Sequence, residues 1–226
     1  MTRAVNRQVA CVCASVGLLA AAPAQAQDPR VEIGGSAGWT LSDGVTFDGV
    51  IAGDGNVYNS IEPKDSFAYS LQAGYFVNPN LEVGFLFSQQ KSTLAVGGTS
   101  EREIGDMSVD NYHGFLAYHF GESDAKVRPY FMGGAGATHY GKVPFSVGNF
   151  AGETGGETQF STTWGLGVKL YPGPKVGINL LARWTPTYIK SDAEGWWCDP
   201  YWGCYVVGDS QYSNQFEFSG GIVFRF

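Results

Sequence analysis

Apolar and polar side chains alternate with a period of two in eight segments of the chain. The segments span residues 31–39, 67–77, 81–87, 112–120, 127–140, 160–170, 176–184 and 216–226. In the last segment one parity is apolar and mostly aromatic, with Phe216, Phe218, Ile222, Phe224 and Phe226. The other parity is small or polar, as at Glu217 and Arg225. A period of two predicts β-strands that each have one apolar face and one polar face.

The connections between these segments alternate between short and long. Short turns are expected at 78–80, 121–126 and 172–175. The long connections are rich in Gly, Asp, Ser and Thr and cover 41–65, 89–107, 141–158 and 189–211. Short turns at one end and long loops at the other are typical of an antiparallel up-and-down barrel. We therefore predict an all-β fold, an eight-stranded antiparallel up-and-down transmembrane β-barrel. The short turns and both chain ends should lie on its periplasmic side.

The charged side chains fall on one face of these segments. Opposite the large apolar side chains lie Glu32, Glu82, Lys169, Arg183, Glu217, Arg225, His113 and His119. A Lys or Arg that faces lipid at the bilayer midplane costs about 2–4 kcal/mol, so this sorting is expected if the apolar face contacts lipid. A soluble eight-stranded barrel is the alternative, but it would hold its apolar side chains inside. The faces of segment 127–140 stay unassigned.

The N-terminal part has the features of a secretory signal peptide. Two arginines precede an apolar run from Val9 to Ala22, and a small-x-small cleavage site ends at Ala26. The run is too short for a transmembrane anchor, which needs about 18 apolar residues. A lipoprotein is the other alternative, but Cys11 comes too early in the run. We expect residues 1–26 to be a signal peptide and residues 27–226 to be the barrel domain.

Composition narrows the function classes. Without the two arginines of the predicted signal peptide, 12 basic residues stand against 21 acidic ones, a formal charge of −9. Proteins that bind nucleic acid carry basic surfaces, so we expect no nucleic-acid partner. Aromatic residues make up 15% of the chain and 32 residues are Gly. Both suit a membrane barrel, which has aromatic girdles outside and a crowded interior.

Two cysteines lie beyond the predicted signal peptide, Cys198 and Cys204. An exported protein meets an oxidising compartment, which favours a disulfide bond between them. In the chain-entropy model, closing so short a loop stabilises the fold by roughly 2–2.5 kcal/mol. A metal site is the weaker alternative, because only two thiols and no nearby His are present.

Two further passages resemble a known family. They are Arg128 to Gly136 and the terminal strand Gly220 to Phe226. With the signal peptide, they make residues 27–226 similar to the small eight-stranded outer-membrane barrels of Gram-negative bacteria, the group that contains the OmpA transmembrane domain. The resemblance implies a place in the cell outer membrane, among its lipids and lipopolysaccharide. No peptidoglycan-binding domain like that of full-length OmpA is expected, since the sequence ends with the barrel.

The resemblance also implies a role for the terminal strand. In this family the barrel-assembly machinery recognises a terminal aromatic strand, which here carries Phe226, Phe224, Ile222 and Phe218. Activity is not implied to the same degree, because such barrels include structural proteins, adhesins, narrow channels and a few enzymes.

The interior of an eight-stranded barrel is just wide enough for its own side chains to fill. We expect a charged network there, made by Glu32, Glu82, Lys169, Arg183 and Glu217, with Arg183 and Glu217 paired on neighbouring strands. Buried charges need partners, which favours a polar plug and a structural or surface-interaction role. A narrow passive channel for small solutes or ions is the alternative.

The long loops are the expected place for recognition. Around the predicted disulfide lie Trp196, Trp197, Tyr201, Trp202 and Tyr205. Exposed Trp and Tyr suit contact with sugar, lipopolysaccharide or protein, so a surface ligand or an adhesin role is an alternative function. The same rings could instead join the interfacial girdle or cap the barrel mouth. Asp43, Asp48 and Asp54 do not follow the EF-hand spacing, so a solvated loop is expected rather than a calcium site.

Enzymatic function has the weakest support. Lipid A-modifying barrels need a Ser or Asp/His constellation near the outer leaflet. His139 is the His at the outer end of a predicted strand, and Ser161 or Ser210 would be its partner. No motif links these residues, and the Gly-rich run at 133–136 has no helix after it to form a phosphate loop. We therefore predict no enzymatic activity, no cofactor and no metal.

Overall fold

The computed structural model describes residues 30–51, 56–147, 150–154, 156–189, 198–199, 203–204 and 211–226. Eight long strands form a barrel wall: β1 Val31–Ser42, β4 Ser66–Asn78, β5 Leu81–Gly98, β6 Arg102–His119, β7 Val127–Tyr140, β10 Thr158–Leu170, β11 Val176–Ile189 and β14 Gln211–Arg225. Six shorter strands lie in the long connections: β2 Val45–Ile51, β3 Val57–Pro63, β8 Val143–Val147, β9 Phe150–Thr154, β12 Cys198–Asp199 and β13 Gly203–Cys204. Within these described ranges, no helix is long and apolar enough to cross a membrane.

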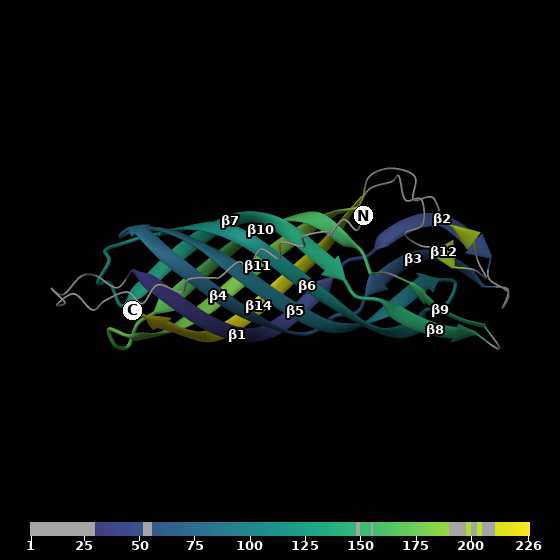
Figure 1. Cartoon of the computed structure of the whole chain (residues 1–226), viewed down its shortest axis with the longest axis horizontal. Helices are drawn as coiled ribbons and strands as arrows, with labels where there is room; N and C mark the ends of the chain where they lie inside the picture. Colours follow the sequence, from purple (N-terminus) through teal and green to yellow (C-terminus); the bar gives the residue numbers. More distant parts are fainter. Residues whose placement is uncertain are drawn as a thin grey trace, which may run out of the picture.

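The eight long strands close into one antiparallel barrel. Hydrogen-bonded neighbours follow the order β5-β4-β1-β14-β11-β10-β7-β6, and β6 pairs back with β5. The first and last strands close the wall in a continuous register from Glu32↔Arg225 to Ser42↔Gln215. Figure 1 shows the barrel lying on its side, with the C-terminus at its left end and β2, β3, β8, β9 and β12 toward its right end. The predicted fold class is confirmed.

The outward and inward faces of the wall have opposite character. On β14 the outward side chains of Phe218, Ile222 and Phe224 are 47–58% exposed, whereas the inward Glu217 is 4% exposed. The same sorting holds around the barrel: the charged and histidine side chains assigned to the polar face all lie inside. An apolar outer face with a polar interior is the pattern of a barrel in lipid.

The long connections are more regular than the sequence predicted. Residues 89–107 were expected to be a loop, but β5 and β6 continue through most of this range as paired strands, with a bulge at Leu94. The reason is that the face that carries the apolar side chains switches from the outside to the inside along each strand. Nearer the short turns the large apolar side chains face outward, while farther along Leu94 and Met107 face inward and Lys91 faces outward.

This far end of the barrel holds an apolar cluster in its interior. Its buried members are Val45, Ile61, Leu94, Met107, Val109, Tyr140, Val143 and Ile189. Beyond the apolar outer band the strands carry polar side chains outside, so the wall there meets water. In water, burial of apolar side chains inside is the favourable arrangement.

Candidate functional site

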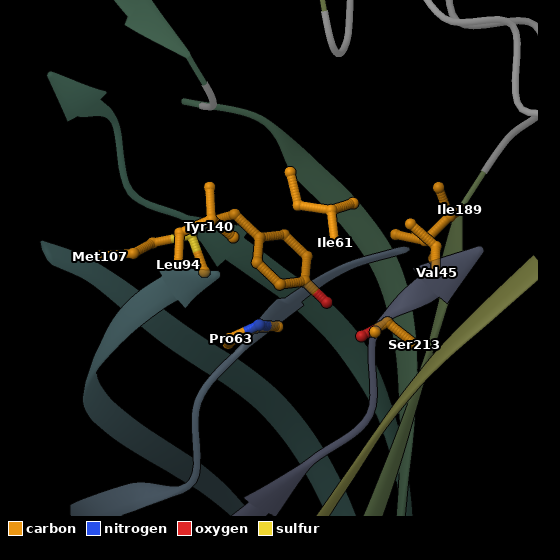
Figure 2. Close-up of a pocket in the computed structure, with 9 residues that line it drawn as sticks. Val45, Ile61, Pro63, Leu94, Met107, Tyr140, Ile189 and Ser213 are labelled. Atoms are coloured by element: carbon orange, nitrogen blue, oxygen red, sulfur yellow. The ribbon is translucent and has the colours of Figure 1, made fainter. Parts of the chain in front are cut away.

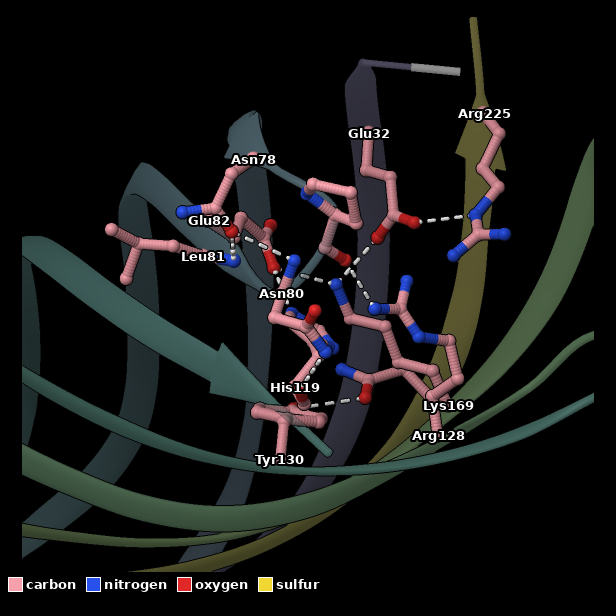
Figure 3. Close-up of polar contacts among 12 residues, drawn as sticks. Glu32, Asn78, Asn80, Leu81, Glu82, His119, Arg128, Tyr130, Lys169 and Arg225 are labelled. Atoms are coloured by element: carbon pink, nitrogen blue, oxygen red, sulfur yellow. Dashed lines mark hydrogen bonds and ion pairs between the residues drawn. The ribbon is translucent and has the colours of Figure 1, made fainter. Parts of the chain in front are cut away.

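A charged network fills the barrel interior at the end of the short turns (Figure 3). Lys169 on β10 donates hydrogen bonds to Glu32 on β1 and to Glu82 on β5, the second at 2.9 Å. Glu32 also accepts hydrogen bonds from Tyr171 and Arg225, both at 2.7 Å. Glu32, Glu82 and Lys169 are at most 2% exposed. Because each acid has a cation beside it, their mutual attraction offsets the cost of burial.

A histidine and a tyrosine extend the network along the lumen. His119 Nε2 lies 2.7 Å from Glu82 Oε2, and the His119 ring stacks on Tyr130 with 5.1 Å between centroids. Tyr130 in turn donates to Asn179 Oδ1 at 2.9 Å. The contacts therefore run from β5 through β6 and β7 to β11.

A third cation and an aromatic ring sit at the base of the network. Arg128 donates to the carbonyl oxygen of Pro79 in the β4–β5 turn at 2.5 Å. The Phe76 ring centroid lies 5.5 Å from Arg128 Cζ and 5.6 Å from Lys169 Nζ. Cations over an aromatic face gain electrostatic attraction, so the Phe76 ring adds to the stabilisation of both cations.

Glycines opposite the network give its bulky side chains room. A Cβ at Gly74 would overlap the carboxylate of Glu82, and a Cβ at Gly167 would overlap the ring of Tyr130. Part of the high Gly content thus serves the packing of large polar side chains in a narrow lumen.

An apolar layer packs against this network. Its members are Leu86, Phe115, Ala117, Tyr130, Met132 and Leu181, each at most 5% exposed. Tyr130 belongs to both the layer and the network, so the two are in direct contact.

Farther along the lumen, Arg183 on β11 and Glu217 on β14 lie opposite each other in register and form an ion pair. Arg183 also donates to Ser88 Oγ at 2.6 Å. Both residues are 4% exposed. The residues expected to form one network thus form two groups, and no ion pair among the described residues joins them. The two groups are Glu32, Glu82 and Lys169, and Arg183 with Glu217.

Uncharged polar side chains form a hydrogen-bonded ladder next to the Arg183–Glu217 pair. Asn111 donates to Gln215 at 3.1 Å, Gln215 to Gln90 at 2.8 Å, and Gln90 to Ser42 at 3.0 Å. Thr138 Oγ1 donates to Asn111 Oδ1 at 2.6 Å. On the inward face of β6, Asn111 lies between His113 and the Val109 of the apolar cluster, so the ladder separates the charged lumen from that cluster.

The structure does not bring His139 and Ser161 together. His139 faces outward, where its Nδ1 lies 2.9 Å from Thr158 Oγ1. Ser161 faces inward, and its hydroxyl lies 2.9 Å from His113 Nε2 in the fully buried interior. This Ser–His contact is enclosed within the wall, so it is part of the interior packing. The other candidate, Ser210, lies outside the described residues.

The sequence analysis did not assign several members of the network to the interior: Arg128, Tyr130, Tyr171, Phe76 and Asn179. It placed His119 and Arg225 on the polar face but did not include them in the expected network. The inward and outward faces of β7 were ambiguous in the sequence, because Tyr130 and Phe131 place an aromatic ring on each face of the strand. Arg128 carried the missing signal. A charge in a lipid-spanning strand faces inward, and that rule puts Tyr130 inside as well.

Several predicted residues fall outside the part of the chain that the structure describes. These are Trp196, Trp197, Tyr201, Trp202, Tyr205 and Asp54, together with the side chain of Asp48. The backbone of β12 and β13 places Cys198 opposite Cys204. Their side chains are outside the described residues, so the disulfide stays a prediction, as does the absence of a calcium site.

The terminal aromatic residues lie where the sequence placed them. Phe218, Ile222, Phe224 and Phe226 all face outward, and Phe226 is 70% exposed. The backbone N–H groups of Arg30 and Val31 donate to the Phe226 carbonyl at 3.0 and 3.2 Å, which closes the barrel seam at the short-turn end. Recognition of this strand by the assembly machinery stays a prediction.

A family profile for the outer membrane protein beta-barrel domain matches residues 11–226. The chain belongs to this family. As an outer-membrane β-barrel, it resides in the cell outer membrane. Such barrels have short periplasmic turns and longer extracellular connections, so the charged network lies at the periplasmic end and the apolar cluster at the extracellular end.

Solved outer-membrane barrels share the fold. OprG from Pseudomonas aeruginosa is 13% identical with a TM-score of 0.60, over 88% of this chain and 96% of that one. AlkL, solved in DMPC bilayers, is 15% identical with a TM-score of 0.52, over 92% and 97%. Neisserial surface protein A is 14% identical with a TM-score of 0.51, over 87% and 97%. No curated protein matches the sequence. Identities this low support a common fold and no particular activity.

Proposed function

We propose that this protein is a sealed outer-membrane barrel, with a structural or surface-interaction role and no open channel. The observation that carries the proposal is the contact between the periplasmic charged network and the apolar layer within one lumen. An ion would have to displace paired, buried charges and then cross a layer of packed apolar side chains. Each step costs far more than passage through water.

The extracellular end supports the surface-interaction role. The wall continues there beyond the apolar outer band, and β2, β3, β8 and β9 add further folded structure. Lys64 forms ion pairs with Glu101 and Glu103 at 2.8 and 3.0 Å on this exposed surface. Hydrogen bonds to these two carboxylates raise the pKa of Lys64 above its ordinary value. A folded extracellular platform suits contact with a surface ligand or with lipopolysaccharide.

An ion-flux assay in proteoliposomes tests the seal. Wild-type protein should release no trapped ions, whereas Leu86→Ala with Leu181→Ala should leak, because it opens the apolar layer. The matched control, Leu116→Ala with Leu180→Ala, changes two outward leucines that are 56% and 47% exposed and should stay tight. Release of trapped ions by the folded wild type, at a rate like that of a leaking interior variant, would refute the proposal and support the narrow-channel alternative.

Enzymatic activity is tested separately. We propose, as the sequence predicted, that the protein is not an enzyme; the proposal is supported by the separation of the candidate pair, since His139 faces outward and Ser161 faces inward. A lipid A deacylation assay that compares the wild type with His139→Ala should detect no activity in either. Activity that depends on His139 would contradict the prediction.

A further inference from the structure

The two ends of the lumen differ in the contacts that they offer to a ligand. At the extracellular end a small recess is lined mainly by apolar side chains, among them Val45, Leu94 and Ile189 (Figure 2). No charged side chain lines this recess among the described residues. At the periplasmic end, the described charged network holds three cations and two carboxylates. A charged ligand therefore finds partners at the periplasmic end.

The cation in excess is Arg128. Lys169 and Arg225 each pair with Glu32, but no ion pair among the described residues joins Arg128 to a carboxylate. The Arg128 guanidinium donates to the Pro79 carbonyl at 2.5 Å, whereas its Nε–H is buried and has no hydrogen-bond partner in the described part of the chain. Arg128 is 2% exposed. A buried guanidinium in this position is costly unless an anion supplies both a charge and an acceptor.

Arg128 reaches the mouth of the barrel. Its partner Pro79 lies in the short β4–β5 turn, so the guanidinium lies at the level of the periplasmic turns. In Figure 3 the guanidinium groups of Arg128 and Arg225 both point toward Glu32. The two positive groups repel each other, and Glu32 is already bonded to Lys169 and Arg225. An anion between the two guanidinium groups would relieve this repulsion.

Two lysines add positive charge at the rim of the same mouth. Lys126 and Lys175 are the residues directly before β7 and β11, and both are exposed. Lys126 lies two residues before Arg128, so it continues the inward face of β7 to the rim. Within the described ranges neither lysine forms an ion pair, although Glu122 and Asp124 lie in the same turn as Lys126. The rim therefore attracts anions toward Arg128.

We propose that the periplasmic mouth binds a phosphate group, held by Arg128 and Arg225 inside and by Lys126 and Lys175 at the rim. A phosphate monoester has a charge of about −1.5 to −2 at pH 7 and several strong acceptor oxygens, so it suits this group of cations better than a single carboxylate does. The planar fork of Arg matches phosphate geometry. Arg225 Cζ lies 3.3 Å from the centroid of the Tyr171 ring, a stacking contact that holds the fork in place. Soluble phosphate esters and the headgroups of inner-leaflet phospholipids both present this group at the periplasmic end.

Titration of the folded barrel with inorganic phosphate tests the site. The protein is held in a non-ionic, phosphate-free detergent, sodium chloride keeps the ionic strength constant, and calorimetry measures the affinity. The wild type should show saturable binding, and its Arg128 Nε–H signal should shift in nitrogen-15 NMR spectra. Arg128→Gln should weaken binding about tenfold or more, because it removes charged hydrogen bonds. The matched control Arg102→Gln changes an exposed arginine at the extracellular end and should bind like the wild type.

A second variant keeps the test decisive if Arg128→Gln does not fold. Lys126→Gln with Lys175→Gln changes exposed side chains alone and should weaken phosphate binding severalfold. Its matched control, Lys64→Gln with Lys91→Gln, removes the same charge at the extracellular end and should have no effect.

Phospholipid nanodiscs identify the source of the phosphate group. An Arg128 Nε–H signal already at its bound position before phosphate is added assigns the site to a lipid headgroup, and a signal that moves only with added phosphate assigns it to a soluble ester. A shift that sodium chloride reproduces would overturn the proposal, as would equal phosphate affinity in the wild type and Arg128→Gln. Binding at the mouth requires no passage through the apolar layer, so these results are independent of the ion-flux test.

Discussion

At the scale of single residues, the lumen depends on charges that are buried with a partner. Charge alone predicted which face Glu32, Lys169 and Arg183 occupy, because an ionised side chain that faces lipid is costly. Charge did not predict which residues meet across the lumen. Lys169 on β10 and Glu32 on β1 are separated by two strands in the wall, so their contact depends on barrel diameter and stagger. The Arg183–Glu217 pair was predictable because the two strands are neighbours.

Removal of one partner from that pair should destabilise the barrel. Arg183→Ala leaves Glu217 buried without its cation and should lower the free energy of unfolding by about 3–5 kcal/mol. Replacement of both residues by Met should recover part of the loss. Lys64→Ala breaks two exposed ion pairs and should change stability little, since water screens them. Urea unfolding from lipid vesicles measures all three variants, and equal midpoints for Arg183→Ala and Lys64→Ala would contradict this prediction.

At the scale of elements, strand positions near the short turns were predictable and strand lengths were not. The eight segments and their turns follow from alternation and from Asn, Pro and Gly at the turns. The extensions of β5 and β6 were missed because apolar side chains face outward where the strand lies in lipid and inward where it lies in water. Outward polar residues such as Gln89, Lys91 and Asp110 mark the change, but a rule that expects one apolar face per strand reads them as a loop.

A lysine scan along one strand locates the lipid boundary. Leu116 and Asp106 both face outward on β6, ten positions apart. Leu116→Lys should cost about 2–4 kcal/mol of unfolding free energy if Leu116 lies near the bilayer midplane. Asp106→Lys places the same side chain beyond the apolar band and should cost little. The change in unfolding free energy is measured by urea unfolding from vesicles. Equal losses for the two variants would place both positions in the same environment and contradict the lipid boundary between them.

Close packing of β6 on β7 gives a second prediction for the elements. A Cβ at Gly136 would overlap the backbone carbonyl of Tyr112, so Gly136→Ala should force the strands apart and cost about 1–3 kcal/mol. Gly173, in the β10–β11 turn, has nothing within 4 Å of an added Cβ. Gly173→Ala should therefore have the same urea midpoint of unfolding as the wild type. An unchanged midpoint for Gly136→Ala would contradict the prediction, because it would show that the strands adapt without strain.

At the scale of the whole molecule, the interior is a stack of layers with alternating character. From the periplasmic end these are the charged network, the apolar layer, the Arg183–Glu217 pair with its polar ladder, and the extracellular apolar cluster. Composition and the width of an eight-stranded barrel predicted a filled lumen. They did not predict the order of the layers, because that order depends on strand stagger as well as on sequence.

Single-channel recording in planar bilayers tests the seal most directly. A shift in electrophoretic mobility on boiling first verifies that each sample contains closed barrels. The wild type should show no unitary current steps, while Leu86→Ala with Leu181→Ala should show them. Reproducible unitary steps from folded wild-type protein would contradict the sealed barrel.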